Sequence, residues 1–70
     1  MTLTFTIETE QEEGGRWIAE VVEIPGAMVY GATTDEAVAQ VQALALRVLA
    51  ERLENGEAAP DFVDVSFRAA

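Results

Sequence analysis

The chain has 70 residues, 50% of them hydrophobic, with no cysteine, no histidine and a formal net charge of −9. This composition predicts a single globular domain, residues 1–70, and excludes disulfides, thiolate or imidazole metal sites and Ser-His or Cys-His catalytic pairs. The charge has the wrong sign for binding nucleic-acid phosphates, and no window is apolar enough to span a membrane. Because no basic segment precedes the first apolar residues, we expect a cytoplasmic protein.

The N-terminal half predicts a β-hairpin. Residues 2–8 alternate polar and apolar side chains, the period-two pattern of a strand with one apolar face. The acidic run 10–13 leads into a Gly-Gly pair, which suits a tight turn. A second strand is expected over residues 16–24, and it carries apolar side chains on both faces. One face has Trp17, Ala19 and Val21, and the opposite face has Ile18, Val22 and Ile24.

A short third strand and a long helix follow. Pro25 ends the second strand because proline cannot donate a ladder hydrogen bond, and residues 27–30 are long enough for a third strand. Thr33 and Glu36 form a capping-box pattern at the start of a helix, and Gly56 marks a left-handed C-terminal cap. The apolar stripe of this helix comprises Val38, Val41, Leu44, Ala45, Val48, Leu49 and Leu53.

Residues 62–68 alternate again and predict a fourth strand. The expected fold is therefore α+β in the order β-β-β-α-β, with one helix packed on one face of a four-stranded, mainly antiparallel sheet. The strand residues expected to meet the helix are Leu3, Phe5, Ile7, Trp17, Ala19, Val21, Val63, Val65 and Phe67.

The opposite sheet face is a candidate interface between copies of the chain. Ile18, Val22 and Phe62 would form an apolar patch there, beside polar side chains. A domain this short buries only about 60% of its unfolded surface, so self-association into a dimer or tetramer would add burial. The alternative is a half-hydrated face with scattered apolar residues.

The sequence shows no catalytic constellation, metal site or cofactor motif. The acidic hairpin residues Glu8, Glu10, Glu12 and Glu13 lack the turn that brings calcium ligands together. Asp35 and Glu36 are adjacent at a helix start, where capping and the helix dipole account for them. We therefore expect no enzymatic activity, no metal and no cofactor.

Three short motifs carry a family resemblance. They are GRWIA at 15–19, EIPGA at 23–27 and GATTDEA at 31–37, followed by the amphipathic helix. In this order and spacing they resemble the N-terminal domain of the HicB antitoxin family. Val22 stands where the family commonly has proline, and Ala27 where it often has cysteine. Many HicB proteins continue into a DNA-binding domain, and the resemblance covers only the part before it, so we expect no direct nucleic-acid binding.

The resemblance implies a reduced ribonuclease-H-like fold without nuclease activity. It also implies a partner, a small basic HicA-type toxin that cleaves mRNA and is neutralised when its active site is covered. Acidic residues on the hairpin and second strand would contact such a partner, and the candidates are Glu8, Glu10, Glu20 and Glu23. The alternative is a stand-alone HicB-like homo-oligomer with a structural or small-ligand role and no toxin.

Overall fold

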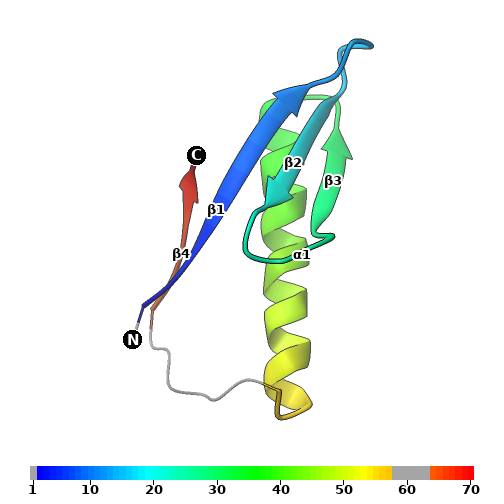
Figure 1. The fold of residues 1–70 in the computed structure, drawn as a ribbon. Helices are drawn as coiled ribbons and strands as arrows, with labels where there is room; N and C mark the ends of the chain where they lie inside the picture. Colours follow the sequence, from blue (N-terminus) through cyan, green and yellow to red (C-terminus); the bar gives the residue numbers. More distant parts are fainter. Residues whose placement is uncertain (1, 58–63) are drawn as a thin grey trace.

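The computed structural model describes residues 2–57 and 64–70. The elements are β1 (Thr2–Gln11), β2 (Trp17–Val21), β3 (Met28–Gly31), α1 (Thr34–Glu54) and β4 (Asp64–Ala69). They form one four-stranded sheet in the order β3-β2-β1-β4, with the helix on one face (Figure 1). β1 pairs antiparallel with β2, β2 antiparallel with β3, and β1 parallel with β4. The predicted β-β-β-α-β order and mainly antiparallel sheet are confirmed.

The helix begins at the predicted cap. The hydroxyl of Thr33 accepts a hydrogen bond from the backbone N–H of Glu36 at 3.1 Å. In a full capping box, the carboxylate of Glu36 would accept from the N–H of Thr33. It accepts instead from the side-chain amide of Gln40 at 3.2 Å. Half of the capping box is therefore present, and it satisfies one of the free N–H groups of the first turn.

The helix ends in a Schellman motif. The N–H of Gly56 donates to the carbonyl of Leu53 at 3.3 Å, and the N–H of Glu57 donates to the carbonyl of Arg52 at 2.7 Å. Gly56 has φ 70°, the left-handed conformation that glycine adopts without a Cβ penalty. The predicted C-terminal cap is confirmed.

The core lies between α1 and the β2–β3 half of the sheet. Its members are one aromatic residue and nine small or branched aliphatic residues: Phe5, Ile7, Ala19, Val21, Ile24, Ala27, Ala37, Val41, Ala45 and Leu49. Two alanines, Ala37 and Ala45, lie along the buried face of α1 together with Val41 and Leu49, so the helix approaches the strands closely. Trp17 is half-buried and packs against the edge of this core.

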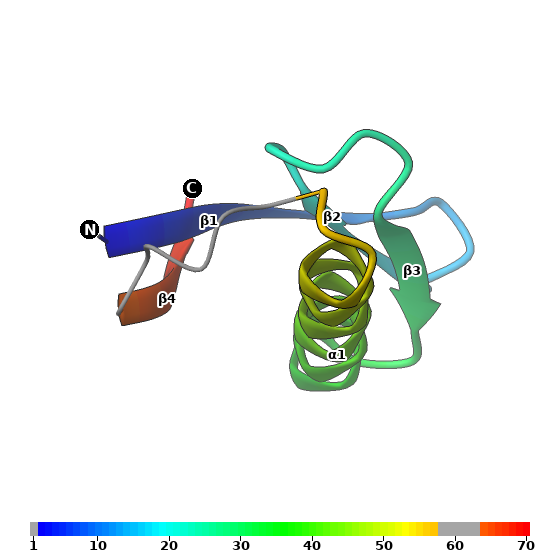
Figure 2. The ribbon, with the colours of Figure 1, turned by 90° about the horizontal axis from the view of Figure 1, so that it is seen from below.

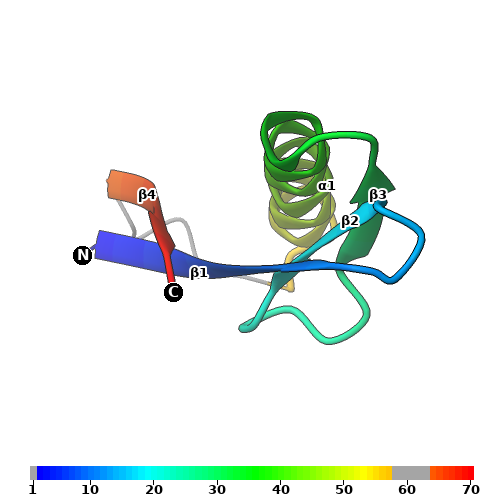
Figure 3. The same cartoon turned by 90° about the horizontal axis from the view of Figure 1, so that it is seen from above.

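The helix covers only part of the sheet. It packs on β2 and β3 and barely reaches β1, while β4 and the adjoining half of β1 stand to one side of it (Figures 2 and 3). Only Ala32 and Thr33 separate β3 from α1, so the helix must start beside β3. The expectation that Val65 meets the helix is therefore wrong, and this side chain is 38% exposed.

β2 is shorter than predicted. It ends at Val21, and the chain turns through residues 22–26, with the N–H of Ile24 donating to Val21 and the N–H of Ala27 donating to Ile24. The turn directs Ile24 into the core, where it is 5% exposed, so its predicted place on the opposite face is wrong. Alternating apolar residues before Pro25 resemble a strand in sequence, but here the reversal begins before the proline.

Candidate protein-binding surface

The sheet side opposite α1 is the outer face, and three of its glutamates lie close together. The β1–β2 register sets Glu8 directly opposite Glu20, and Glu10 directly opposite Ile18. The β2–β3 register sets Ile18 opposite Tyr30. Three of the four predicted partner-binding glutamates therefore share one patch, around a shallow depression of about 190 Å³ lined by Glu8, Thr9, Glu10, Ile18 and Glu20.

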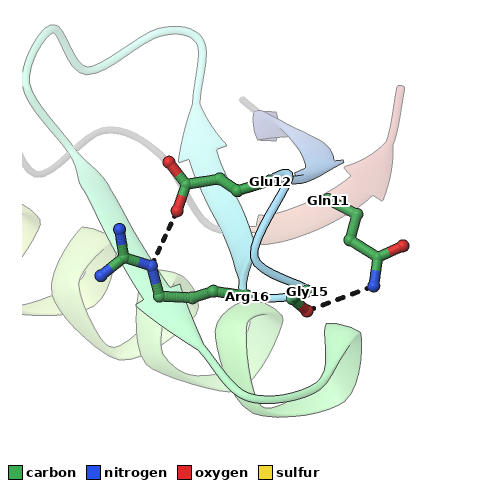
Figure 4. Close-up of polar contacts among 4 residues, drawn as sticks. All are labelled: Gln11, Glu12, Gly15 and Arg16. Carbon is green, nitrogen blue, oxygen red and sulfur yellow. Dashed lines mark hydrogen bonds and ion pairs between the residues drawn. The ribbon is translucent and has the colours of Figure 1, made fainter.

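The hairpin loop determines this register. The N–H of Glu12 donates to the carbonyl of Arg16 at 2.7 Å. The Gln11 side-chain amide donates to the carbonyl of Gly15 at 3.2 Å (Figure 4). A slip of one residue would turn every side chain of the strand to the other face, so these bonds decide that Glu8 meets Glu20.

Within residues 2–57 and 64–70, neither of the facing carboxylates forms an ion pair with a basic side chain. Like charges directly opposite each other on neighbouring strands destabilise a sheet. The one ion pair among residues 2–57 and 64–70 joins Arg16 Nε to Glu12 Oε1 at 2.7 Å (Figure 4). The same guanidinium lies 3.9 Å above the ring centroid of Tyr30. Arg16 therefore contacts Glu12 and Tyr30, and Arg68, on the neighbouring strand β4, donates to the hydroxyl of Thr6. In the described part of the chain, neither arginine forms an ion pair with Glu8 or Glu20.

Apolar side chains border the acidic patch. Met28 and Tyr30 of β3 are 47% and 43% exposed, and Ile18 is half-buried between them and β1. Met28 and Tyr30 are not among the residues predicted for this surface, although their alternation with Val29 in the sequence indicates that they share one face. Tyr and Met are enriched at protein-binding surfaces relative to the rest of a protein's surface.

The predicted interface residues are only partly together. Ile18 lies on the outer face, whereas Val22 is 49% exposed on the turn after β2, with its N–H donating to the carbonyl of Thr6 at 3.0 Å. Phe62 lies outside the described residues, as does Val63. Association through Ile18, Val22 and Phe62 stays a prediction.

Glu23, the fourth predicted partner-binding residue, is bonded within the chain. Its carboxylate accepts from the backbone N–H of Thr6 at 2.7 Å and from the hydroxyl of Thr6 at 2.7 Å. These two bonds, aided by nearby Arg68, hold the pKa of the Glu23 carboxyl below its ordinary value of 4.5. The carboxylate thereby fastens the turn after β2 to the middle of β1, a structural role.

Glu23→Gln is expected to lower the free energy of unfolding at pH 7. The two hydrogen bonds from Thr6 are strong because the carboxylate that accepts them is charged, and the neutral amide of glutamine cannot replace both of them. A carboxyl whose pKa is lowered by folding stabilises the protein above its unfolded pKa and loses that contribution as pH falls through the folded pKa. The difference between wild type and variant should therefore shrink below pH 4.5. Urea unfolding at pH 7 and at acidic pH measures it.

Glu13→Gln is the matched control, since Glu13 is an exposed carboxylate in the hairpin loop. It should leave the free energy of unfolding nearly unchanged at both pH values. A Glu23→Gln deficit that is equally large at acidic pH would show that the carboxylate's charge is not what matters.

The function of the outer face is indicated neither by a metal-binding cluster in the described residues nor by similarity to a known protein. Within the described ranges, no three acidic side chains are grouped so that they could hold a metal ion. In the same part of the chain, no helix has the length and apolar character needed to cross a membrane. No protein-family model matches the chain, and no curated protein or solved structure is significantly similar to it. The function is therefore inferred from the outer face and the sequence motifs.

Proposed function

We propose that the chain is a non-enzymatic, HicB-like antitoxin-type binding protein of the cytoplasm. It would neutralise a small basic HicA-type mRNA-cleaving toxin by direct protein–protein contact. The HicB-like motifs support the scaffold, and the net charge of −9 supports a basic partner. The observation that carries the proposal is that Glu8 and Glu20 face each other on the outer face and form no ion pair within residues 2–57 and 64–70.

A basic partner would relieve a repulsion that the isolated chain must tolerate. Two carboxylates facing each other across β1 and β2 cost stability without improving the core. A toxin surface built to bind RNA phosphates carries arginines and lysines that pair favourably with such carboxylates. Ile18, Met28 and Tyr30 would supply the apolar contacts around them.

Glu20→Arg separates binding from folding. Arginine opposite Glu8 converts a repulsive cross-strand pair into an attractive one, so the variant should be about 0.5 kcal/mol more stable than wild type. The same change places a positive charge where the toxin's basic surface would dock, so inhibition should weaken at least about tenfold, or about 1.4 kcal/mol. The test first searches the neighbouring reading frames for a small basic protein and then titrates the chain into an mRNA-cleavage assay of that protein.

Glu54→Arg is the matched control, because it makes the same charge change on an exposed residue in the last turn of α1. Wild-type chain and this control should inhibit cleavage equally. If wild type does not inhibit the neighbouring basic protein, or if Glu54→Arg and Glu20→Arg weaken inhibition alike, the outer face is not a toxin-binding surface.

A further inference from the structure

β4 is an open edge of the sheet. It pairs with β1 on one side and is the last strand in the order β3-β2-β1-β4, and no described segment lies beyond it (Figures 1 and 3). The helix lies over the other half of the sheet, so Val65 is exposed and Phe67 is half-buried on the helix side of β4. Such an edge is a ready template for another strand.

The pairing of β4 with β1 shows which residues of β4 turn their backbone N–H and C=O groups toward the open edge. The N–H of Ala70 donates to the carbonyl of Ile7 at 2.9 Å, in a parallel ladder that sets Ile7 beside Ala69. Backbone groups alternate in direction along a strand, so the even-numbered residues of β4 turn theirs toward β1. The N–H and C=O groups of Val65 and Phe67 therefore point to the open edge.

The sequence of β4 is complementary to itself in one antiparallel register. When Ser66 lies opposite Ser66 of a second copy, Val65 lies opposite Phe67, and these are the residues whose backbone groups point outward. In that register, Asp64 lies opposite Arg68 of the second copy, and Arg68 lies opposite its Asp64. Unlike charges and a β-branched residue against an aromatic ring are both favourable cross-strand pairs. Sliding the strands by two residues in either direction breaks both charge pairs.

Charge also favours a second copy at this edge over other places on the chain. The whole chain carries −9, so most pairs of surfaces would repel each other. β4 holds one acidic and one basic residue, Asp64 and Arg68, and is itself neutral. Two β4 edges therefore meet without the repulsion that two acidic outer faces would suffer.

We propose that two copies of the chain associate through antiparallel pairing of β4 with β4 about a two-fold axis at Ser66, forming one continuous sheet. In this dimer each Val65–Phe67 pair exchanges both backbone hydrogen bonds, and the Asp64–Arg68 pairs lie on the outer side. Both helices lie on the same face, and Val65 and Phe67 gain apolar neighbours across the axis. This dimer does not depend on the proposed toxin partner.

Charge reversal tests both the edge and the register. Asp64→Arg sets arginine against arginine at both symmetric pairs, and Arg68→Asp sets aspartate against aspartate, so each variant alone should dimerise at least about tenfold more weakly than wild type. An equimolar mixture of the two variants places unlike charges at every pair and should form the heterodimer with wild-type strength. Sedimentation velocity gives the association constants, and native mass spectrometry identifies the heterodimer by mass.

Two controls address charge and folding. Glu54→Arg and Arg47→Asp repeat the two charge changes on exposed residues of α1 and should leave the dimer intact. Arg68 also donates to the hydroxyl of Thr6 at 3.3 Å, so a variant that leaves this bond in place is needed. Val65→Pro removes an N–H that points to the open edge and spares the β1–β4 ladder, so it should give a folded monomer by circular dichroism.

A wild-type chain that sediments as a 7.6 kDa monomer at about 1 mM, a concentration that reveals even weak complexes, would overturn the proposal. So would a dimer that survives Val65→Pro, or a mixture of the charge-reversed variants that does not restore association. A dimer that Ile18→Glu dissociates and the β4 variants do not would place the interface on the outer face instead.

Discussion

Gly31→Ala is expected to lower the free energy of unfolding by about 3 kcal/mol, because β3 passes against the first turn of α1 with no room for a side chain. A Cβ on Gly31 would lie 2.6 Å from the backbone nitrogen of Ala37 and 3.0 Å from its Cα. Both atoms belong to the helix backbone, so relief requires the start of α1 to shift. The close approach is possible because Ala37 is itself small and fully buried.

The measurement is urea unfolding at one fixed protein concentration, followed by the fluorescence of Trp17, the one tryptophan of the chain. Gly14→Ala is the matched control, since a Cβ at Gly14 meets nothing within 4 Å. This control should change stability by less than about 0.5 kcal/mol. Equal losses in the two variants would show that the contact between Gly31 and Ala37 is not the cause.

Phe5→Ala is expected to cost about 4 kcal/mol, a large part of the total stability of so short a domain. Phe5 is 4% exposed at the centre of β1, between the half of the sheet that α1 covers and the half that it leaves open. Its ring lies 5.6 Å from the ring of Phe67 at an interplanar angle of 32°. Truncation removes core packing and one of the side-chain contacts that hold β4 to β1.

Leu46→Ala serves as the comparison, because Leu46 is 47% exposed on α1. The same urea titration should show a loss of less than about 0.5 kcal/mol for it. A Phe5→Ala loss no larger than this would mean that the β1–β4 half of the sheet contributes little to folding.

Features that depend on neighbouring residues could be predicted from the sequence. The helix start at Thr33 and the cap at Gly56 each require a few adjacent residues, and both are confirmed. Strand one was equally clear because one apolar face must alternate with period two. The turn after Val21 was not predicted, since Val22 and Ile24 continue the alternation of a strand that has already ended.

Features that depend on distant segments could not be predicted in the same way. The apolar stripe of α1 shows which side of the helix is buried, but not that the helix lies over β2 and β3 and leaves β4 uncovered. Glu8 and Glu20 were both selected as acidic candidates, yet only the register of the hairpin makes them face each other. Glu23 was selected for its charge, and its hydrogen bonds to Thr6 appear only when the turn folds back on β1.

The parallel pairing of β1 with β4 also has a kinetic consequence. It joins residues such as Thr4 and Ser66, which are 62 positions apart in sequence, whereas β1, β2 and β3 meet through short turns. Loop-closure entropy makes such distant pairings slow to form, so β4 is expected to dock after the hairpins and the helix. Until it docks, β1 is the open edge, so the order of folding events decides which strand first meets another chain.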